Sequence, residues 1–450
     1  MASVREIEVD CPLATRAPAP RGRTTKTVLL AATAAAAISL MVGLSAIATP
    51  ALAQEAAPAA DAAAAPTEPP GIKWSAYVEA GATFNSDGPT GGTNYGHLFT
   101  DKTNQLVLNQ LSGTVSKDLD PKAEGFDWGF KVQGFYGTDA RYTHFLGILD
   151  TGIKERTQFD LVEANVLLHF PSPGAGGLDL KVGAFSTPLG AEVIAAPSNL
   201  LYSHSYIFNF GLPLKHTGAL ATLHLTPDID LYGGVDSGVN TTLSDGDNNG
   251  AAAGIFGIGL NNLVDGKLTV LALTHVGPEN PSLKAPLGYA DANNENRWIS
   301  DITATFKATD ELTLITELNY IKDDLFNVDG GGIAQYVSYT LSPELTATLR
   351  AEWWRDGHGF FVAAFPGNRD FVFLEKGEPL EKGAIGPGVG TSYGELTLGL
   401  TWKPADLGLL DGLTLRPEVR YDKANHAAYD NLTKDDQFTF GVDLILPFGG

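Results

Sequence analysis

The strongest constraint on the fold of this chain is an alternation of apolar and polar residues at period two, which runs from residue 71 to residue 448. It occurs in segments of about ten residues, separated by stretches rich in turn-forming residues. In segment 413–422, Arg416 and Arg420 fall on the polar face, whereas leucine, proline, valine and tyrosine fill the alternate positions. Because successive side chains of a β-strand point to opposite faces, the sequence predicts an all-β fold.

Segment length and charge placement indicate what each face contacts. Strands of soluble sheets usually have about five or six residues, whereas a strand that crosses a bilayer needs about 9–11. A charged side chain that faces lipid at the membrane midplane costs about 2–4 kcal/mol. Arg416 and Arg420 both avoid that face, and a register shift of one residue would expose both to lipid. The pattern therefore favours transmembrane strands around a polar lumen.

We predict about sixteen strands, an even number as in bacterial outer-membrane barrels. They are 72–84, 104–117, 126–136, 157–170, 177–185, 215–226, 229–238, 250–261, 267–275, 296–307, 311–320, 332–341, 344–355, 393–403, 412–421 and 436–448. The connections alternate between long ones (85–103, 137–156, 186–214, 239–249, 276–295, 321–331, 356–392 and 422–435) and short ones such as 227–228 and 342–343. We therefore predict that residues 71–450 form a transmembrane antiparallel up-and-down β-barrel, with long external loops and short periplasmic turns.

Two segments precede the barrel. Four basic residues lead into an apolar run at 28–48, and Ala51 and Ala53 then form a small-x-small cleavage pattern. We predict that residues 1–53 are a signal peptide, cleaved before Gln54; a membrane-anchoring helix is the alternative. With no Arg-Arg pair to suggest twin-arginine export, we expect the Sec route. Residues 54–70 are rich in Ala and Pro and are expected to be a disordered periplasmic leader.

Composition removes several functional classes. Acidic residues outnumber basic ones by 52 to 30, giving a net charge of −22, so binding of nucleic acid through a general basic field is excluded. The single cysteine, Cys11, rules out disulfides and cysteine-based metal sites. An apolar content of 44% argues against a multi-helix membrane protein. The six tryptophans all fall in predicted strands, where interfacial girdle positions are expected for most and core packing is the alternative.

The third external loop, 186–214, is unusually apolar for a segment exposed to water. We expect it to fold into the barrel and to narrow the lumen, with Glu192 and His204 presented to solutes. The alternative is a loop packed on the rim or against a neighbouring subunit. A wide barrel of sixteen strands leaves an aqueous channel that such a loop would constrict.

Basic residues recur on the lumen face of the last strands. They are Arg350, Lys403, Arg416 and Arg420, interleaved with Glu352, Glu395 and Glu418. Two interpretations stay open for this set. The residues form a neutral network of cross-strand ion pairs that stiffens the wall, or they set the field that selects ions.

Three segments resemble a known family. They are FSTPLGAEVIAAPSNLLYSHSYIFNFGLPLKHTGA (185–219), LRPEVRYD (415–422) and FTFGVDLILPF (438–448). Each is similar to the matching segment of the outer-membrane β-barrel porin family of the OmpL-like, BBP-2 type. The resemblance implies a channel-forming role and implies no particular substrate.

The expected function is an outer-membrane porin for passive diffusion of small hydrophilic solutes. The alternatives are a non-conducting structural or adhesion barrel and an outer-membrane hydrolase. The expected partners are outer-membrane lipid, the barrel-assembly machinery, small hydrophilic solutes or ions, and further copies of the chain in a homotrimer, by analogy with other sixteen-strand porins. No nucleic acid is expected, and the expected location is the outer membrane of a Gram-negative cell.

Motifs that carry chemistry are weak in this sequence. Gly390–Gly394 matches the G-x-S-x-G pattern of hydrolases but leads into a predicted strand rather than a helix. Residues 245–250 resemble half of a calcium loop, and Phe256 stands where such a loop needs a bidentate glutamate. The nine histidines show no metal-binding spacing, although His204 and His216 flank the third loop. We therefore predict no catalytic residue, no metal ligand and no cofactor.

Overall fold

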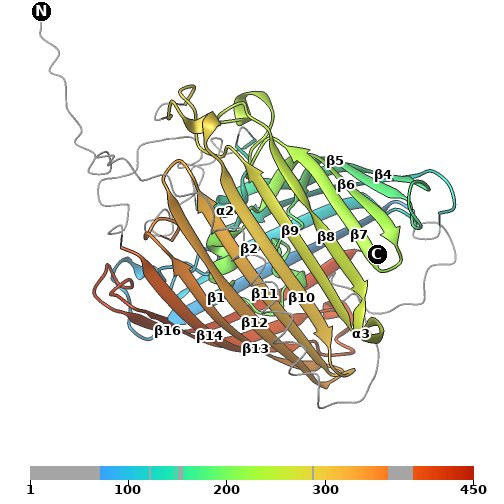
Figure 1. Cartoon of the computed structure of the whole chain (residues 1–450). Coiled ribbons are helices and arrows are strands. Elements are labelled where there is room, and N and C mark those ends of the chain that lie inside the picture. The colour runs from blue at the N-terminus through green and yellow to red at the C-terminus, as the bar shows by residue number, and fades with distance from the viewer. Residues whose placement is uncertain are drawn as a thin grey trace, which may run out of the picture. The chain divides into compact units, whose positions relative to one another are not determined.

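Sixteen antiparallel strands close into one barrel in the computed structural model (Figure 1). The structure describes residues 71–120, 123–146, 148–149, 156–285, 288–362 and 389–449. Each strand pairs with its neighbours in sequence, and β1 pairs with β16 to complete the ring. The predicted up-and-down barrel is confirmed. The segments predicted as signal peptide (1–53) and periplasmic leader (54–70) lie outside the described residues.

The strands agree closely with the predicted segments. They are β1 Lys73–Asn85, β2 Gln105–Lys117, β3 Asp127–Gly137, β4 Gln158–Phe170, β5 Leu178–Ser186, β6 Lys215–Thr226, β7 Ile229–Asp236, β8 Ala253–Asn262, β9 Leu268–Gly277, β10 Arg297–Lys307, β11 Leu312–Asp323, β12 Val328–Ser342, β13 Leu345–Asp356, β14 Thr391–Trp402, β15 Thr414–Ala424 and β16 Asp436–Gly449. Short helical turns include η1 Thr90–Gly92, α2 Ala140–Thr143, η2 Ala196–Ser198, η3 Ile207–Gly211, η4 Ser244–Gly246, α3 Leu263–Gly266, η5 Ala292–Asn294 and η7 Gly408–Leu410. Within the described ranges, no helix is both long and apolar enough to cross a membrane.

The two faces of each strand differ as the alternation predicts. On β16, Phe438 and Phe440 are exposed on the outside of the barrel, whereas Gln437 and Thr439 between them are buried on the inside. On β15, Arg416 and Arg420 likewise point inward and are buried. Apolar side chains thus form the outer surface of the barrel, and polar and charged side chains line its interior.

Five of the six tryptophans lie on the outer surface near strand ends, as expected for interfacial girdles. Trp74, Trp128 and Trp402 are at the ends that carry the short turns, and Trp298 and Trp353 are near the ends that carry the long loops. Trp354 is the exception among them. It points inward and is fully buried against the third loop.

One predicted connection is wrong. The long loop expected over 321–331 is a tight turn, because β11 continues to Asp323 and β12 begins at Val328. Gly330 and Gly331, which lie in the predicted loop, and Gly332, which begins the predicted strand, all pair in register with β13. A Cβ atom on Gly332 would lie 2.3 Å from the backbone oxygen of Trp353, so these glycines let two backbones approach closely.

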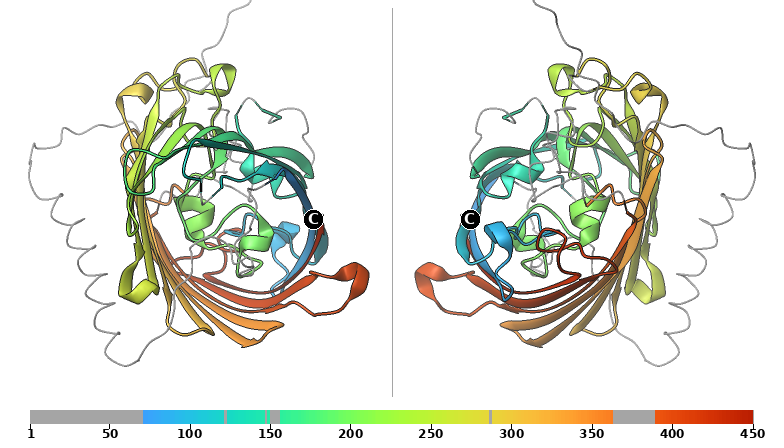
Figure 2. Two further views of the ribbon diagram at one scale, coloured as in Figure 1. Left: turned by 90° about the vertical axis from the view of Figure 1, so that its right-hand side faces the viewer. Right: turned by 90° about the vertical axis from the view of Figure 1, so that its left-hand side faces the viewer.

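The interior of the barrel is occupied by loop 186–214. Figure 2 shows the ring of strands from both ends, with the green segment that carries η3 inside it. Side chains on the wall of a sixteen-strand barrel cannot fill its lumen by themselves. The hydrophobic core of this molecule therefore forms inside the barrel, where the loop packs against the wall.

Candidate functional site

Loop 186–214 leaves the wall at the point where β5 ends at Ser186. Beyond the end of β5, the Lys215 ammonium donates to both carboxylate oxygens of Asp160, at 2.8 and 2.7 Å. The two side chains meet where β5 would lie if it continued between β4 and β6. Both side chains are completely buried. The ion pair thus joins β4 to β6 and closes the wall above the departing loop.

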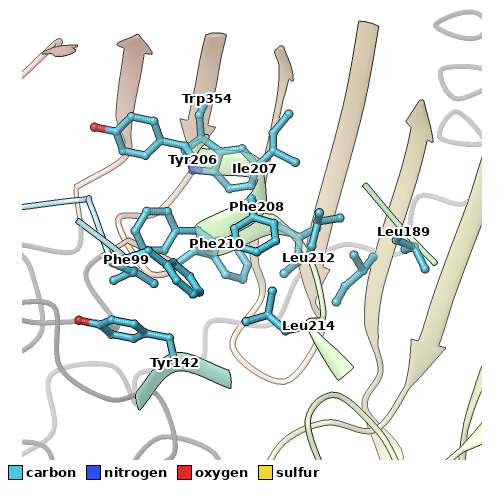
Figure 3. Packing of buried hydrophobic residues seen from close by; sticks show 14 of the residues in the cluster. Phe99, Tyr142, Leu189, Tyr206, Ile207, Phe208, Phe210, Leu212, Leu214 and Trp354 are labelled. Atoms are coloured by element: carbon cyan, nitrogen blue, oxygen red, sulfur yellow. The ribbon is translucent and has the colours of Figure 1, made fainter. Parts of the chain in front are cut away.

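Aromatic side chains hold the middle of the loop inside the barrel. Tyr206, Ile207, Phe208 and Phe210 are almost completely buried around η3, and Figure 3 shows them packed beside Trp354 of β13 and near Phe99. Burial of one such side chain contributes about 1.5–3 kcal/mol. This explains why so apolar a loop is compatible with a polar barrel interior, because little of its apolar surface meets water. The expectation that the loop folds inward agrees with this placement.

Arg350 of β13 is the central polar anchor. Its guanidinium donates to Glu192 of the loop at 2.6 Å, to Glu395 of β14 at 3.0 Å and to the backbone oxygen of Ser203 at 2.7 Å. The side chain is fully buried. A buried guanidinium requires this set of acceptors, because an unpaired buried charge is strongly unfavourable.

Arg416 and Arg420 of β15 fasten the loop through its backbone. Arg416 donates to the carbonyls of Ala196 and Asn199 at 3.0 and 2.7 Å, and Arg420 donates to the carbonyl of His204 at 2.6 Å. Each also has an acidic partner on the wall: Asp443 at 2.5 Å for Arg416 and Asp422 at 2.7 Å for Arg420. The positive charge of each arginine is therefore balanced within the wall.

Wall carboxylates bind the amides of the same loop. Glu418 accepts the N–H groups of Tyr202 and Ser203 at 2.9 and 3.1 Å, and Glu352 accepts those of Tyr206 and Ile207 at 2.7 and 2.8 Å. Glu317 of β11 accepts the N–H of Ala191 at 3.1 Å. Arginines thus bind loop carbonyls and glutamates bind loop amides, so wall residues of both positive and negative charge hold the loop.

Glu192 and His204, expected to face solutes, instead face each other. His204 Nδ1 lies 3.2 Å from Glu192 Oε2, and its ring stacks on Phe208 with centroids 4.1 Å apart. Burial opposes ionisation of Glu192, but Arg350 and His204 outweigh it and lower the pKa of this carboxyl to about 2. The two side chains are 5% and 7% exposed, so in this structure they stabilise the loop rather than meet open water.

Lys403 and the pair of His204 and His216 do not lie where the sequence analysis places them. Lys403 lies one residue beyond β14, is exposed, and pairs its backbone N–H with Glu344 in a short turn. It takes no part in the arginine network. His204 and His216 have different partners, since His216 Nε2 lies 3.0 Å from Thr187 Oγ1.

The side chains of the two weak motifs form local hydrogen bonds. Ser392 of the G-x-S-x-G match lies within β14, and its hydroxyl accepts a hydrogen bond from Arg355 at 3.1 Å. The Asp247 carboxylate of the calcium-like segment accepts the N–H groups of Asn249 and Gly250 at 3.0 and 2.6 Å. Both groups stabilise local backbone.

The sequence analysis did not assign several residues that shape this site. Asp443 could have been found, because it lies directly opposite Arg416 in the register of β15 and β16. Gly81 and Gly399 could not, since a glycine on a strand does not reveal what packs on it. A Cβ on Gly81 would lie 2.5 Å from the Tyr202 ring, and one on Gly399 would lie 2.4 Å from Leu201.

The loop leaves part of the wall uncovered. Its polar anchors between residues 190 and 211 come from β2, β11 and β13–β15. On β3, which pairs with β2, the Lys131 side chain remains 40% exposed and reaches Glu163 at 3.5 Å.

Comparisons with known proteins agree with this architecture. An anion-selective porin from Comamonas acidovorans has a TM-score of 0.51 at 10% identity, covering 84% of this chain and 99% of that one. OmpT of Vibrio cholerae, in its in-vitro folded trimer form, has a TM-score of 0.50 at 10% identity, covering 85% and 100%. Its loop L8 deletion mutant gives the same values. At such identities these structures show the fold alone.

The sequence itself gives the family. No curated protein matches this chain in sequence. The profile of the family described as "Putative beta-barrel porin-2, OmpL-like" matches residues 71–448, which is the whole described barrel except its last residue. The chain belongs to this OmpL-like β-barrel porin-2 family.

Proposed function

We propose that this chain is an outer-membrane porin whose water-filled channel allows passive diffusion of small hydrophilic solutes and is narrowed by loop 186–214. The observation that supports this most directly is the fastening of the loop inside the barrel by wall residues of both signs, Arg350 and Glu418 among them. A polar interior and an apolar exterior suit a channel in a membrane.

The three buried arginines act chiefly as anchors in this proposal. Each is matched by a nearby carboxylate and is at most 3% exposed, so none of them meets a passing solute directly. The charge that a solute meets is then set by groups on the uncovered wall. Lys131 is such a group, and its neighbour Glu163 only partly offsets it, because their charged atoms are 3.5 Å apart and the lysine is half-exposed.

The test is single-channel conductance of the purified chain in a planar bilayer, with reversal potentials measured under a salt gradient. We expect stepwise openings, and we expect Lys131→Gln to move the reversal potential toward cation preference. Lys403→Gln is the matched control, since it removes an exposed lysine in a short turn. A folded barrel that stays silent with every solute and voltage tried would exclude the open channel.

A non-conducting barrel is the second candidate, and one observation favours it. Glu192, Ile207 and Phe210 of the loop are buried together with Arg350 and Arg420 of the wall that holds it. If the loop closes the lumen at rest, only variants that loosen it will conduct. Openings in a loop-loosening variant combined with silence of the parent chain would support this candidate.

Export and assembly complete the proposal. Residues 1–53 would direct the chain through the Sec route and be removed, the barrel-assembly machinery would insert it into outer-membrane lipid, and three copies would associate. N-terminal sequencing of the protein from outer membranes is expected to begin at Gln54. Native mass spectrometry is expected to give three chains, and a monomer would contradict the trimer.

A further inference from the structure

A cluster of two histidines and two carboxylates lies inside the barrel near the base of loop 186–214. His216 is the second residue of β6, Asp236 ends β7, and His275 lies near the end of β9, so all three are at the strand ends that carry the long loops. Glu279 follows β9 in the next loop. All four side chains are at most 4% exposed, and all four point toward one another.

Polar atoms in this cluster lack hydrogen-bond partners. They are His216 Nδ1, Asp236 Oδ2, His275 Nδ1 and Glu279 Oε1. Leaving a buried polar group unsatisfied costs about 1–3 kcal/mol. Two of these atoms, His216 Nδ1 and Asp236 Oδ2, face each other, and a cation bound between them would interact with both.

The distances suit a metal ion. His216 Nδ1 lies 3.3 Å from Asp236 Oδ2, and His275 Nε2 lies 3.1 Å from Asp236 Oδ1. Nitrogen and oxygen ligands lie about 2.0–2.2 Å from zinc, so two ligand atoms of a tetrahedral site are about 3.3–3.6 Å apart. One ligand atom from each of these three residues lies within 4.8 Å of the others.

The remaining polar atoms are placed to orient those ligands. His216 Nε2 lies 3.0 Å from Thr187 Oγ1, and Asp236 Oδ1 accepts the N–H of Gly238 at 2.7 Å. Glu279 Oε1 lies 3.7 Å from His275 Nδ1, while its other oxygen accepts the N–H of Val239 at 2.7 Å. Histidine ligands of metals usually donate their second N–H to a hydroxyl, carbonyl or carboxylate. Thr187 is within hydrogen-bond distance of His216, and Glu279 is the carboxylate beside the second nitrogen of His275.

Small residues make room for the cluster. Gly218 lies opposite Asp236 in the β6–β7 register, where a Cβ would come within 2.9 Å of the Asp236 side chain. On the other side, Ala253 of β8 pairs with Asp236, so no large side chain separates it from His275. The carboxylate of Asp236 can therefore reach His275 across β8 and His216 on the adjacent strand β6.

We propose that His216, Asp236 and His275 bind a divalent transition-metal ion of the zinc class, with Glu279 and Thr187 orienting the two histidines. Two imidazoles and a carboxylate are a ligand set that zinc favours, and they leave a fourth position for water. The negative charges of Asp236 and Glu279 together balance the ion. The site joins the base of loop 186–214 to the loops that follow β7 and β9, independently of whether the barrel conducts.

This site has no signature in the sequence, because its ligands are spread over three strands and share no spacing motif. The earlier prediction of no metal ligand rested on spacing alone. The pairing of β6 with β7, of β7 with β8 and of β8 with β9 brings the three side chains together.

The test is metal binding by the full chain, expressed without a polyhistidine tag, purified from outer membranes and dialysed against a chelator. We expect calorimetric titration to give one tightly bound Zn²⁺ per chain. Titration with Co²⁺ should give the intense visible absorption of a site of low coordination number, and X-ray absorption of the zinc form should show two imidazoles. These measurements need no variant.

Variants then locate the site. His216→Gln and His275→Gln are each expected to weaken Zn²⁺ binding at least 100-fold, and Glu279→Gln by about 10–100-fold, as for other residues that orient metal ligands. His426→Gln is the matched control, since His426 is exposed and outside the cluster. If the parent chain does not bind Zn²⁺ stoichiometrically, or if the His216→Gln and His275→Gln variants bind Zn²⁺ as tightly as the parent chain, the cluster is a hydrogen-bonded group of side chains without metal.

Discussion

At the scale of single residues, Arg350, Arg416 and Arg420 each do two things. It forms an ion pair with a wall carboxylate, and it donates to a group of the inward loop, as Arg416 does with Asp443 and with the carbonyls of Ala196 and Asn199. Of the two interpretations of the basic set, the distances show the network of ion pairs. The field that selects ions stays a prediction.

Arg350→Met is expected to lower the free energy of unfolding by about 3–5 kcal/mol, because it leaves Glu192 and Glu395 buried without their guanidinium. Urea titration in detergent, followed by tryptophan fluorescence, measures this. Lys403→Gln is the control from the same predicted set and should change stability by less than about 0.5 kcal/mol, since its side chain is exposed. Equal effects of the two variants would contradict the role of Arg350 as an anchor.

The ionisation of Glu192 predicts how this anchor depends on pH. Its pKa of about 2 in the folded chain lies below the value of about 4.3 for an unfolded glutamate. Its contribution to stability is therefore fully present above about pH 4.3 and is lost as the pH falls toward 2. The stability difference between the parent chain and Glu192→Gln should stay constant from pH 7 to pH 5 and shrink only below that range. A difference that already shrinks between pH 7 and pH 5 would rule this out.

At the scale of elements, alternation and turn chemistry are sufficient to predict all sixteen strands and their faces, and the apolar content of loop 186–214 predicts its inward fold. Each strand obeys a local rule, so local sequence reveals it. Glycine was ambiguous, because the run at 330–332 looks like a loop but allows β12 to pack closely on β13. The contacts between the wall and the loop backbone could not be predicted. Arg420, for example, donates to the backbone oxygen of His204, and every residue has such an oxygen, so the sequence does not single it out.

Gly81→Val tests whether loop 186–214 needs a wall position without a side chain in order to pack. A Cβ at this position would lie 2.5 Å from the Tyr202 ring, so the substitution must displace the loop. We expect the free energy of unfolding to fall by about 1–3 kcal/mol, as for other overpacked sites, and the single-channel conductance to rise. Gly113→Val on β2 is the control, because nothing lies near its Cβ. Unchanged stability in Gly81→Val would mean that Tyr202 moves without disturbing the loop.

At the scale of the whole molecule, the barrel has its charges inside and its apolar surface outside. Exposed apolar side chains such as Val132, Leu398 and Phe440 lie on the outer surface of strands distributed around the ring. Buried ion pairs occupy the interior of the same strands. In water this distribution would promote aggregation, and in a bilayer it matches the environment on both faces. The position of the membrane along the barrel is therefore a property that stability measurements can map.

Leu398 and Leu106 provide that map. Leu398 is 52% exposed near the middle of β14, whereas Leu106 is 80% exposed at the second position of β2, beside a long loop. An arginine costs about 2–4 kcal/mol at the bilayer midplane and about 0–1 near the interface. Leu398→Arg should therefore reduce the free energy of unfolding in lipid vesicles by about 2–4 kcal/mol, and Leu106→Arg should change it little. In detergent the two losses should converge, because micelles impose no fixed midplane. If Leu106→Arg proves the more costly in vesicles, the membrane lies nearer the long loops than the tryptophan positions indicate.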